Sequence, residues 1–226
     1  MKLNERLYIG NNEAKAVDVV ANLNYRSPGT ATIITNTKPS MREIVAYECG
    51  YNGKLVRWFM GYVESYKQIN SDTYSLFCRE LSAVLRNSLP LAMQHKTLTD
   101  VLNRVTQITG LHFVIPDRDY VKTPAAHIIN HTTGYTLFDN LGDVYGIERY
   151  VWQQQGDGRI FVGSWNDSPW YGKNIPLPHD YINNAQTNNA QIPMNPLFRP
   201  GVLINGERVR TIELNKSKMQ IQWMTK

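Results

Sequence analysis

The strongest constraint on the fold is the dipeptide Asn52-Gly53, which separates two apolar runs at residues 44–51 and 55–63. Both central positions of the tightest hairpin turn need a positive φ, which Asn and Gly adopt more readily than other residues. The dipeptide therefore predicts a β-hairpin in the first quarter of the chain, and with it an antiparallel sheet.

Other strand signals surround this hairpin. From residue 17 to residue 25 every second residue is apolar, which is the period of a strand with one buried face. A run rich in Thr and Ile at residues 30–35 follows the turn Ser27-Pro28-Gly29, and another strand pair flanks Asn70-Ser71-Asp72. Short strands joined by tight turns predict a small antiparallel β-barrel domain over residues 1–87.

The pattern changes to helices and strands after residue 87. Thr97 and Asp100 have the spacing of a capping box, in which the N-cap residue and the third helical residue each bond to the other's backbone. Apolar residues then share one helical face as far as Gly110, a typical helix stop. A second helix of similar pattern ends near Gly146, and strands are expected at 111–115, 148–153 and 159–162. Residues 88–165 therefore predict a compact α/β module.

The last quarter of the chain divides into two parts. Residues 166–195 show little periodicity and several prolines, and such long loops commonly serve binding, so we predict an extended arm. Residues 198–209 predict two strands around an Asn205-Gly206 turn, and residues 219–223 alternate as a final strand. We therefore assign 166–226 to the arm and a second, reduced β-barrel element. The expected fold class is α+β and mainly β, with two small antiparallel β-barrel-like elements flanking the α/β module.

Charge and composition exclude several classes of protein. The net charge of +5 is spread along the chain, whereas nucleic-acid binders concentrate basic residues on one helix or face. We expect no specific nucleic-acid binding, although a ring through which DNA passes is compatible with this charge. No segment has the roughly 18 apolar residues of a membrane span, and Lys2, Glu5 and Arg6 interrupt any export signal. We expect a protein without membrane contact, made in the cytoplasm, with Cys49 and Cys78 as packed thiols.

No arrangement of catalytic residues stands out. His127 and His131 on a strand would lie about 13 Å apart, too far for one metal ion. Asp117 and Asp119 follow a proline, where aspartates usually bond to the local backbone of a turn. Ser164 lacks the flanking glycines of a hydrolase nucleophile. We therefore expect no enzyme activity, no metal and no cofactor.

Aromatic residues are the richest candidates for binding. Trp165, Trp170 and Tyr171 surround a proline at the start of the predicted arm, and Trp58 lies within a predicted strand. These residues could form a stacking platform for sugars or bases, or they could anchor a protein interface, where Trp, Tyr and Arg dominate the binding energy. We favour the interface and add Phe198 and Arg199 as candidates for it.

The order of segments resembles the tail-hub proteins of Mu-like bacteriophages. The stretches that carry the resemblance are residues 58–64 and 77–81 for the first barrel, Leu89-Pro90 and residues 97–111 for the passage into the α/β module, and residues 198–209 with Trp223 for the second barrel. The resemblance spans most of the chain, which is shorter than typical hubs, and its second barrel is reduced to about sixty residues.

The resemblance implies a structural virion protein of the tail or baseplate that forms a homotrimer. Three chains with two barrel-like elements each would make a ring of six similar units, which matches a sixfold tail tube on one face and a threefold spike on the other. The type VI secretion spike protein is similar in this respect. The implied partners are the tail tube or distal tail protein, the spike protein and the tape measure protein.

Two other functions are compatible with parts of the sequence. Periplasmic secretin-type domains have short modules with a similar Thr-Leu helix and a Thr-Gly-Leu turn, but they require an export signal. A sugar-binding or cell-wall-binding module is supported by the tryptophans alone. Binding to peptidoglycan would favour the second alternative over a purely structural role.

Overall fold

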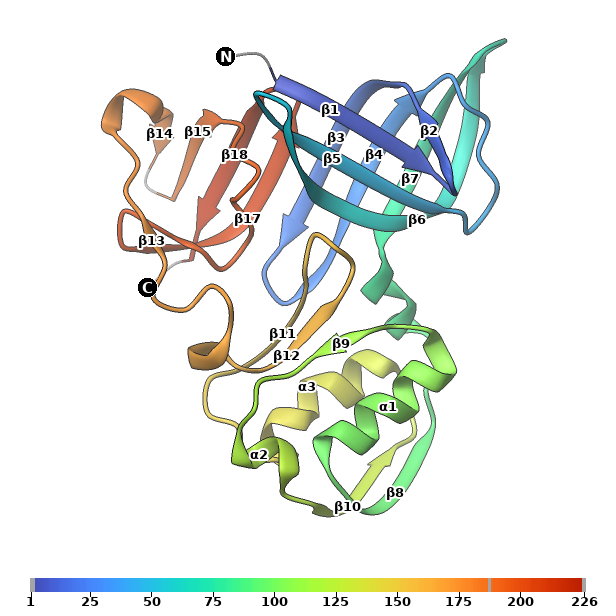
Figure 1. Ribbon diagram of the computed structural model, residues 1–226, viewed down its shortest axis with the longest axis vertical. Helices are drawn as coiled ribbons and strands as arrows, with labels where there is room; N and C mark the ends of the chain where they lie inside the picture. The colour runs from blue at the N-terminus through green and yellow to red at the C-terminus, as the bar shows by residue number, and fades with distance from the viewer. Residues whose placement is uncertain (1–2, 187, 225–226) are drawn as a thin grey trace. The chain divides into compact units, whose positions relative to one another are not determined.

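The computed structural model describes residues 3–186 and 188–224, and it divides the chain into two compact units (Figure 1). The β unit comprises Met1–Glu80 and Gly172–Lys226, and the α/β unit comprises Leu81–Tyr171. Met1 and Lys2, from the segment considered for an export signal, and Thr187, from the predicted arm, lie outside the described residues. The mainly β, α+β fold class predicted from the sequence is confirmed.

One curled, 13-stranded sheet makes up the β unit. Its strands from the first part of the chain are β1 (Leu3–Ile9), β2 (Asn12–Ala14), β3 (Ala16–Asn24), β4 (Ser27–Thr35), β5 (Ile44–Tyr51), β6 (Lys54–Asn70) and β7 (Thr73–Glu80). Its strands from the last part are β13 (Asn174–Ile175), β14 (Asn183–Gln186), β15 (Asn189–Pro193), β16 (Leu203–Ile204), β17 (Glu207–Asn215) and β18 (Lys218–Trp223), with a short 3-10 helix, η3 (His179–Tyr181), before β14.

The two ends of the chain are joined edge to edge within this sheet. β17 pairs antiparallel with β3, from Thr211 opposite Asn24 to Asn215 opposite Val20, and the order of strands runs β14-β15-β18-β17-β3-β4-β7-β6-β5-β1-β2. Figure 1 shows the late strands in orange and red beside the early strands in blue. The β part near the C-terminus therefore continues the first sheet through backbone hydrogen bonds.

The tight turns form where the sequence predicts them. Asn52 and Gly53 have φ values of 55° and 76° between β5 and β6, and Asn205 and Gly206 have 52° and 84° between β16 and β17. Positive φ at both central positions matches the twist of the flanking strands. Both predicted Asn-Gly hairpins are confirmed.

β6 is 17 residues long and exchanges partners along its length. Its first half pairs with β5 as far as Tyr62, and its second half pairs with β7 as far as Asn70. The two pairings overlap at Gly61 and Tyr62, and a Cβ atom at Gly61 would lie 2.1 Å from the carbonyl oxygen of Arg79. Only glycine permits so close an approach of the two backbones.

The α/β unit contains two short sheets and two main helices. Its elements are η1 (Leu81–Arg86), β8 (Leu91–Lys96), α1 (Leu98–Thr109), β9 (Phe113–Val114), α2 (Asp119–Lys122), β10 (Ala125–Asn130), α3 (Gly134–Val144), β11 (Tyr150–Gln154), β12 (Ile160–Ser164) and η2 (Trp165–Asp167). β10 pairs with β8, and β12 pairs with β11 and β9. Leu98, Val101 and Val105 of α1 and Phe138 and Leu141 of α3 are buried in one core.

The ends of both helices follow from local chemistry. The capping box between Thr97 and Asp100 is present, and Gly110 ends α1 with a φ of 74°. α3 begins at Gly134 behind the N-cap Thr133, two residues before the predicted start of the helical pattern at Thr136. The hydroxyl oxygen of Thr133 accepts a hydrogen bond from the backbone N–H of Thr136, which fixes the earlier start.

The segment predicted as an extended arm, residues 166–195, is in large part folded. Asn189–Pro193 forms β15, which pairs with β18, and β14 pairs with β15 at the end of the sheet. β15 alternates between buried and partly buried residues, but the partly buried ones, Asn189 and Gln191, are polar, and for this reason we did not predict a strand here. The division into a β-barrel domain, an α/β module and an arm with a second barrel element, at residues 87 and 165, stays a prediction; the structure groups residues 1–80 and 172–226 in one unit.

Candidate functional site

Three of the six interface candidates form a buried cluster in the β unit. Trp58, Phe198 and Arg199 expose 0%, 1% and 9% of their surface. The indole Nε1 of Trp58 donates to the carbonyl oxygen of Phe198 at 3.1 Å, and the guanidinium of Arg199 donates to the carbonyl oxygen of Trp58. These contacts hold residues 198–199 against β6. Because the three side chains are buried, they expose almost no surface to a partner in this fold.

Arg199 also reaches the buried carboxylate of Glu80. Its Nη2 lies 2.9 Å from Oε1 of Glu80, while the N–H of Gly29 donates to Oε2 at 2.7 Å. Burial raises the pKa of Glu80, and the charge of Arg199 and the hydrogen bonds offset part of that effect. Sequence reasoning missed Glu80, because no local pattern marks a carboxylate at the end of an apolar strand as the partner of a distant arginine.

The other three candidates lie at the end of the α/β unit. Trp165 and Trp170 are buried and stack on each other with ring centroids 5.9 Å apart, and Phe161 meets Trp170 edge to face. Tyr171 alone among the six is largely exposed, at 53%. The tryptophans therefore do not present an open platform for a sugar, and the interface role of all six residues stays a prediction.

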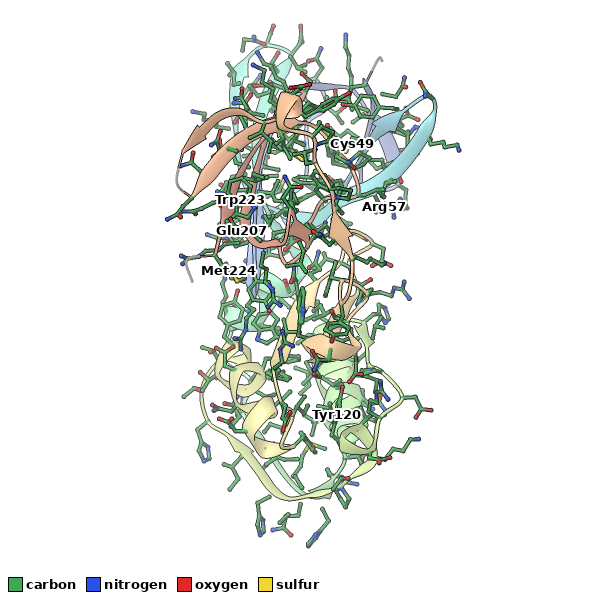
Figure 2. All side chains as sticks on the ribbon, turned by 90° about the vertical axis from the view of Figure 1, so that its left-hand side faces the viewer. Cys49, Arg57, Tyr120, Glu207, Trp223 and Met224 are labelled. Atoms are coloured by element: carbon green, nitrogen blue, oxygen red, sulfur yellow. The ribbon has the colours of Figure 1, made fainter. Side chains whose placement is uncertain are left out.

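Tyr171 borders a shallow polar hollow of about 420 Å³. Arg118 and Asp167 form an ion pair at 2.7 Å in its wall, and the hydroxyl of Tyr120 donates to Asp167 at 3.0 Å. Partial burial raises the pKa of Tyr120, labelled in Figure 2, to about 12, so its phenol stays protonated at neutral pH. Arg118 and Asp167 in the wall of the hollow are thus already paired with each other.

Asp117 and Ser164, two of the residues considered for catalysis, are engaged in local contacts. The carboxylate of Asp117 is exposed and pairs with Lys122, which lowers the pKa of Asp117. The hydroxyl of Ser164 donates to the carbonyl oxygen of Glu148 and accepts from the N–H of Asn166, as an N-cap does. Within the described residues, no group of three or more His, Cys, Asp and Glu side chains could hold a metal ion.

Both cysteines are packed inside the sheet as free thiols. Burial raises the pKa of Cys49, labelled in Figure 2, well above its usual value, and burial also raises the pKa of Cys78, to about 12. A thiol is a weak nucleophile until it ionises, so neither cysteine is set up for covalent chemistry.

A mainly apolar groove of about 770 Å³ lies in the β unit. Tyr51 and Val56 line it from β5 and β6, and Tyr181 and Leu197 line it from the late segments. Leu197 is 69% exposed and Tyr181 is 54% exposed, so the groove places large apolar side chains in contact with solvent. Sequence reasoning did not find this groove, since its walls come from segments more than a hundred residues apart.

In the part of the chain that the structure describes, no helix is long and apolar enough to cross a membrane.

No protein-family model matches the chain. A curated relative, an uncharacterized 58.7 kDa protein in the lys 3′ region of Haemophilus phage HP1, is 33% identical over 217 residues, which is 95% of this chain. The chain spans 40% of the length of that relative.

Solved structures match over nearly the whole chain. The 43 kDa tail protein of prophage MuSo2 from Shewanella oneidensis matches with a TM-score of 0.71 at 11% identity, over 99% of this chain and 98% of that one. The chain has the fold of phage tail proteins. The resemblance predicted from the order of segments is confirmed at the level of this fold.

Two further structures show how widely the tail-protein fold occurs. The tail protein from Neisseria meningitidis MC58 matches with a TM-score of 0.65 at 11% identity, covering 99% of this chain and 96% of that one. An E. coli component of the type VI secretion system, described as similar to phage T4 tail proteins, matches with a TM-score of 0.60 at 10% identity, covering 97% and 76%. The tail-protein fold thus occurs in phage tails and in a secretion machine.

Proposed function

We propose that this chain is a structural, non-enzymatic component of a phage tail hub or baseplate that acts by assembling as a homotrimer. The observation that carries the proposal is the match to the MuSo2 tail protein over 99% of the chain, both units included. The relative in phage HP1 supports a phage setting for the same chain. In this role the protein is made in the host cytoplasm and becomes part of the virion tail.

The trimer is proposed to adapt two symmetries. Each chain carries early and late β strands in one sheet, and three such chains would place six similar β elements around an axis. Such a ring fits a sixfold tail tube, or a distal tail protein, on one face and a threefold spike on the other. The tape measure protein would meet the same axis, and DNA would pass through the opening without sequence-specific contacts.

Surface properties support a role in assembly. The apolar groove beside Leu197 and Tyr181 exposes large side chains, and an exposed apolar patch on a protein usually marks an interface. By contrast, the ion pair of Glu80 and Arg199 is buried, and so are the two cysteine thiols. These groups are not accessible to a substrate. We therefore assign function to surfaces and not to a catalytic pocket.

The oligomeric state tests the proposal most simply. Light scattering of the purified chain over a hundredfold range of concentration is expected to give three times the chain mass of 25.9 kDa at the upper end. A constant mass of one chain across the whole range would contradict it. Saturable binding to peptidoglycan, measured in parallel by co-sedimentation, would instead favour a cell-wall-binding module.

A further inference from the structure

The second half of β6 has a paired neighbour on one side only. β5 pairs with β6 as far as Tyr62, and the backbone of Arg42 and Glu43 bonds to Val63. Beyond that point β7 covers one side of residues 65–70. On the other side, no described strand pairs with these six residues. An edge of this length is a ready template for another strand.

The first half of β1 has a second open edge. β5 pairs with all of β1, but β2 covers only Leu7–Ile9 on the other side. Beside residues 3–6 lies a hollow of about 660 Å³, lined by β1 and by residues 13–16. A further hollow of about 270 Å³, lined in part by residues 16–19 of β3, adjoins it. Space beside an unpaired strand is what an incoming strand requires.

The two open edges cannot meet within one copy. In Figure 1 β1 starts beside the N-terminus, whereas the tip of the β6–β7 hairpin lies on the other side of the β unit. The two outermost strands in the order of the sheet are short, with three residues in β2 and four in β14. Short edges are a common protection against unwanted pairing, and the longer β6 edge lacks it.

The charges of the two edges are compatible with pairing. Lys67 is the only charged residue in the stretch 65–70. The two hollows beside β1 are lined by three acidic and three basic residues: Glu5, Glu13, Asp18, Arg6, Lys15 and Lys216. Arg6 and Glu13 already pair at 3.6 Å. A lining of balanced charge suits a polar strand with a single charge. Glu5, whose Oε1 accepts a hydrogen bond from the hydroxyl of Tyr47 at 2.6 Å, is the acidic residue of β1 that Lys67 would face across the strands.

We propose that the β6 edge at residues 65–70 of one copy pairs with the β1 edge at residues 3–6 of the next copy. This contact rests on the proposed ring and names the surfaces that close it. Each copy offers two different edges, which gives a head-to-tail contact of the kind that forms closed rings. Backbone hydrogen bonds across the junction supply the affinity, as in other strand additions.

Engineered disulfides test this pairing in the full chain. The variant K67C/E5C places one exposed thiol on each edge, and its native thiols are buried. S65C/E5C and I69C/E5C sample registers shifted by two residues, which keep the side chains on the same face. Mild oxidation followed by a non-reducing gel is expected to give linked pairs and triplets of chains. K67C/I129C is the matched control, because Ile129 is 63% exposed on β10 of the α/β unit.

The outcomes separate this contact from the ring itself. Linked chains in at least one of the three variants, with none in the control, would support the edge pairing. Trimers by light scattering without linked chains would overturn the pairing and leave the proposed ring standing. Chains that stay single in solution would overturn both. Hydrogen exchange of the unmodified protein adds a measurement without substitutions: the amides of residues 65–70 are expected to be protected in the oligomer and to exchange fast after dilution.

Discussion

Glu80 and Arg199 are 119 positions apart in the sequence, yet their side chains meet inside the β unit. Each charge would be costly to bury alone, and each is compensated by the other and by backbone groups of Gly29 and Trp58. Their pairing fixes the late segment of the chain against β6 and β7. We proposed an interface role for Arg199 because of its residue type. The side chain instead lies in the interior, paired with Glu80, and no local sequence pattern predicts this contact.

Removing one partner of this pair is expected to destabilise the protein strongly. E80Q leaves the guanidinium of Arg199 without its counter-charge in the interior, which costs roughly 3–5 kcal/mol in comparable cases. The double variant E80L/R199M removes both charges and is expected to recover most of that loss. Urea unfolding measures both. An E80Q protein as stable as the parent would show that the ion pair contributes nothing to the fold.

At the scale of elements, short-range signals predicted the structure well. The Asn-Gly turns, the capping box of α1 and its stop at Gly110 depend on residues within a few positions of one another, and all are present. The pairing of β17 with β3 joins residues nearly two hundred positions apart, and alternating hydrophobicity marks a strand without naming its neighbour. The apolar groove escaped prediction for the same reason.

The capping box makes a pH-dependent contribution to α1. The backbone N–H and the hydroxyl of Thr97 both donate to Oδ2 of Asp100 at 3.0 Å, and these hydrogen bonds lower the pKa of Asp100. A lowered pKa in the folded state means that the stabilisation is present above the ordinary Asp pKa of about 3.9 and is lost as the pH falls through the folded value.

Two substitutions at this cap separate its parts. T97A is expected to cost about 1 kcal/mol at pH 7, because the N-cap oxygen is lost. D100N is expected to lose less stability than the parent when the pH is lowered from 7 to 3. Urea unfolding at the two pH values checks both expectations. An identical loss in D100N and the parent would contradict the assigned role of the carboxylate.

Gly61 tests the close approach of β6 and β7. In G61A the new methyl group would lie 2.1 Å from the carbonyl oxygen of Arg79, and backbone cannot move aside as a flexible side chain can. We expect a loss of about 3 kcal/mol, as in other overpacked sites. G53A is the control: it has a positive φ of 76° but nothing within 4 Å, and it should cost only about 1 kcal/mol. Thermal unfolding of both variants decides whether the steric contact in G61A or the backbone strain in G53A costs more stability.

At the scale of the whole molecule, the described sheet has open edges and an exposed apolar groove. We propose that other subunits cover these surfaces in the assembly. The sequence predicted the mainly β class and the resemblance to tail proteins, because strand periodicity and the order of segments survive where identity is low. It did not predict that early and late strands share one sheet, because the whole α/β unit separates these strands in the sequence.

The central claim is that copies of this chain complete one another in a ring. Particle imaging of the purified protein at concentrations where light scattering reports assembly tests it most directly. We expect threefold-symmetric rings of three chains around a central opening, with β density continuous from one subunit to the next. Particles of a single chain, or assemblies whose subunits touch only through the α/β unit, would contradict it.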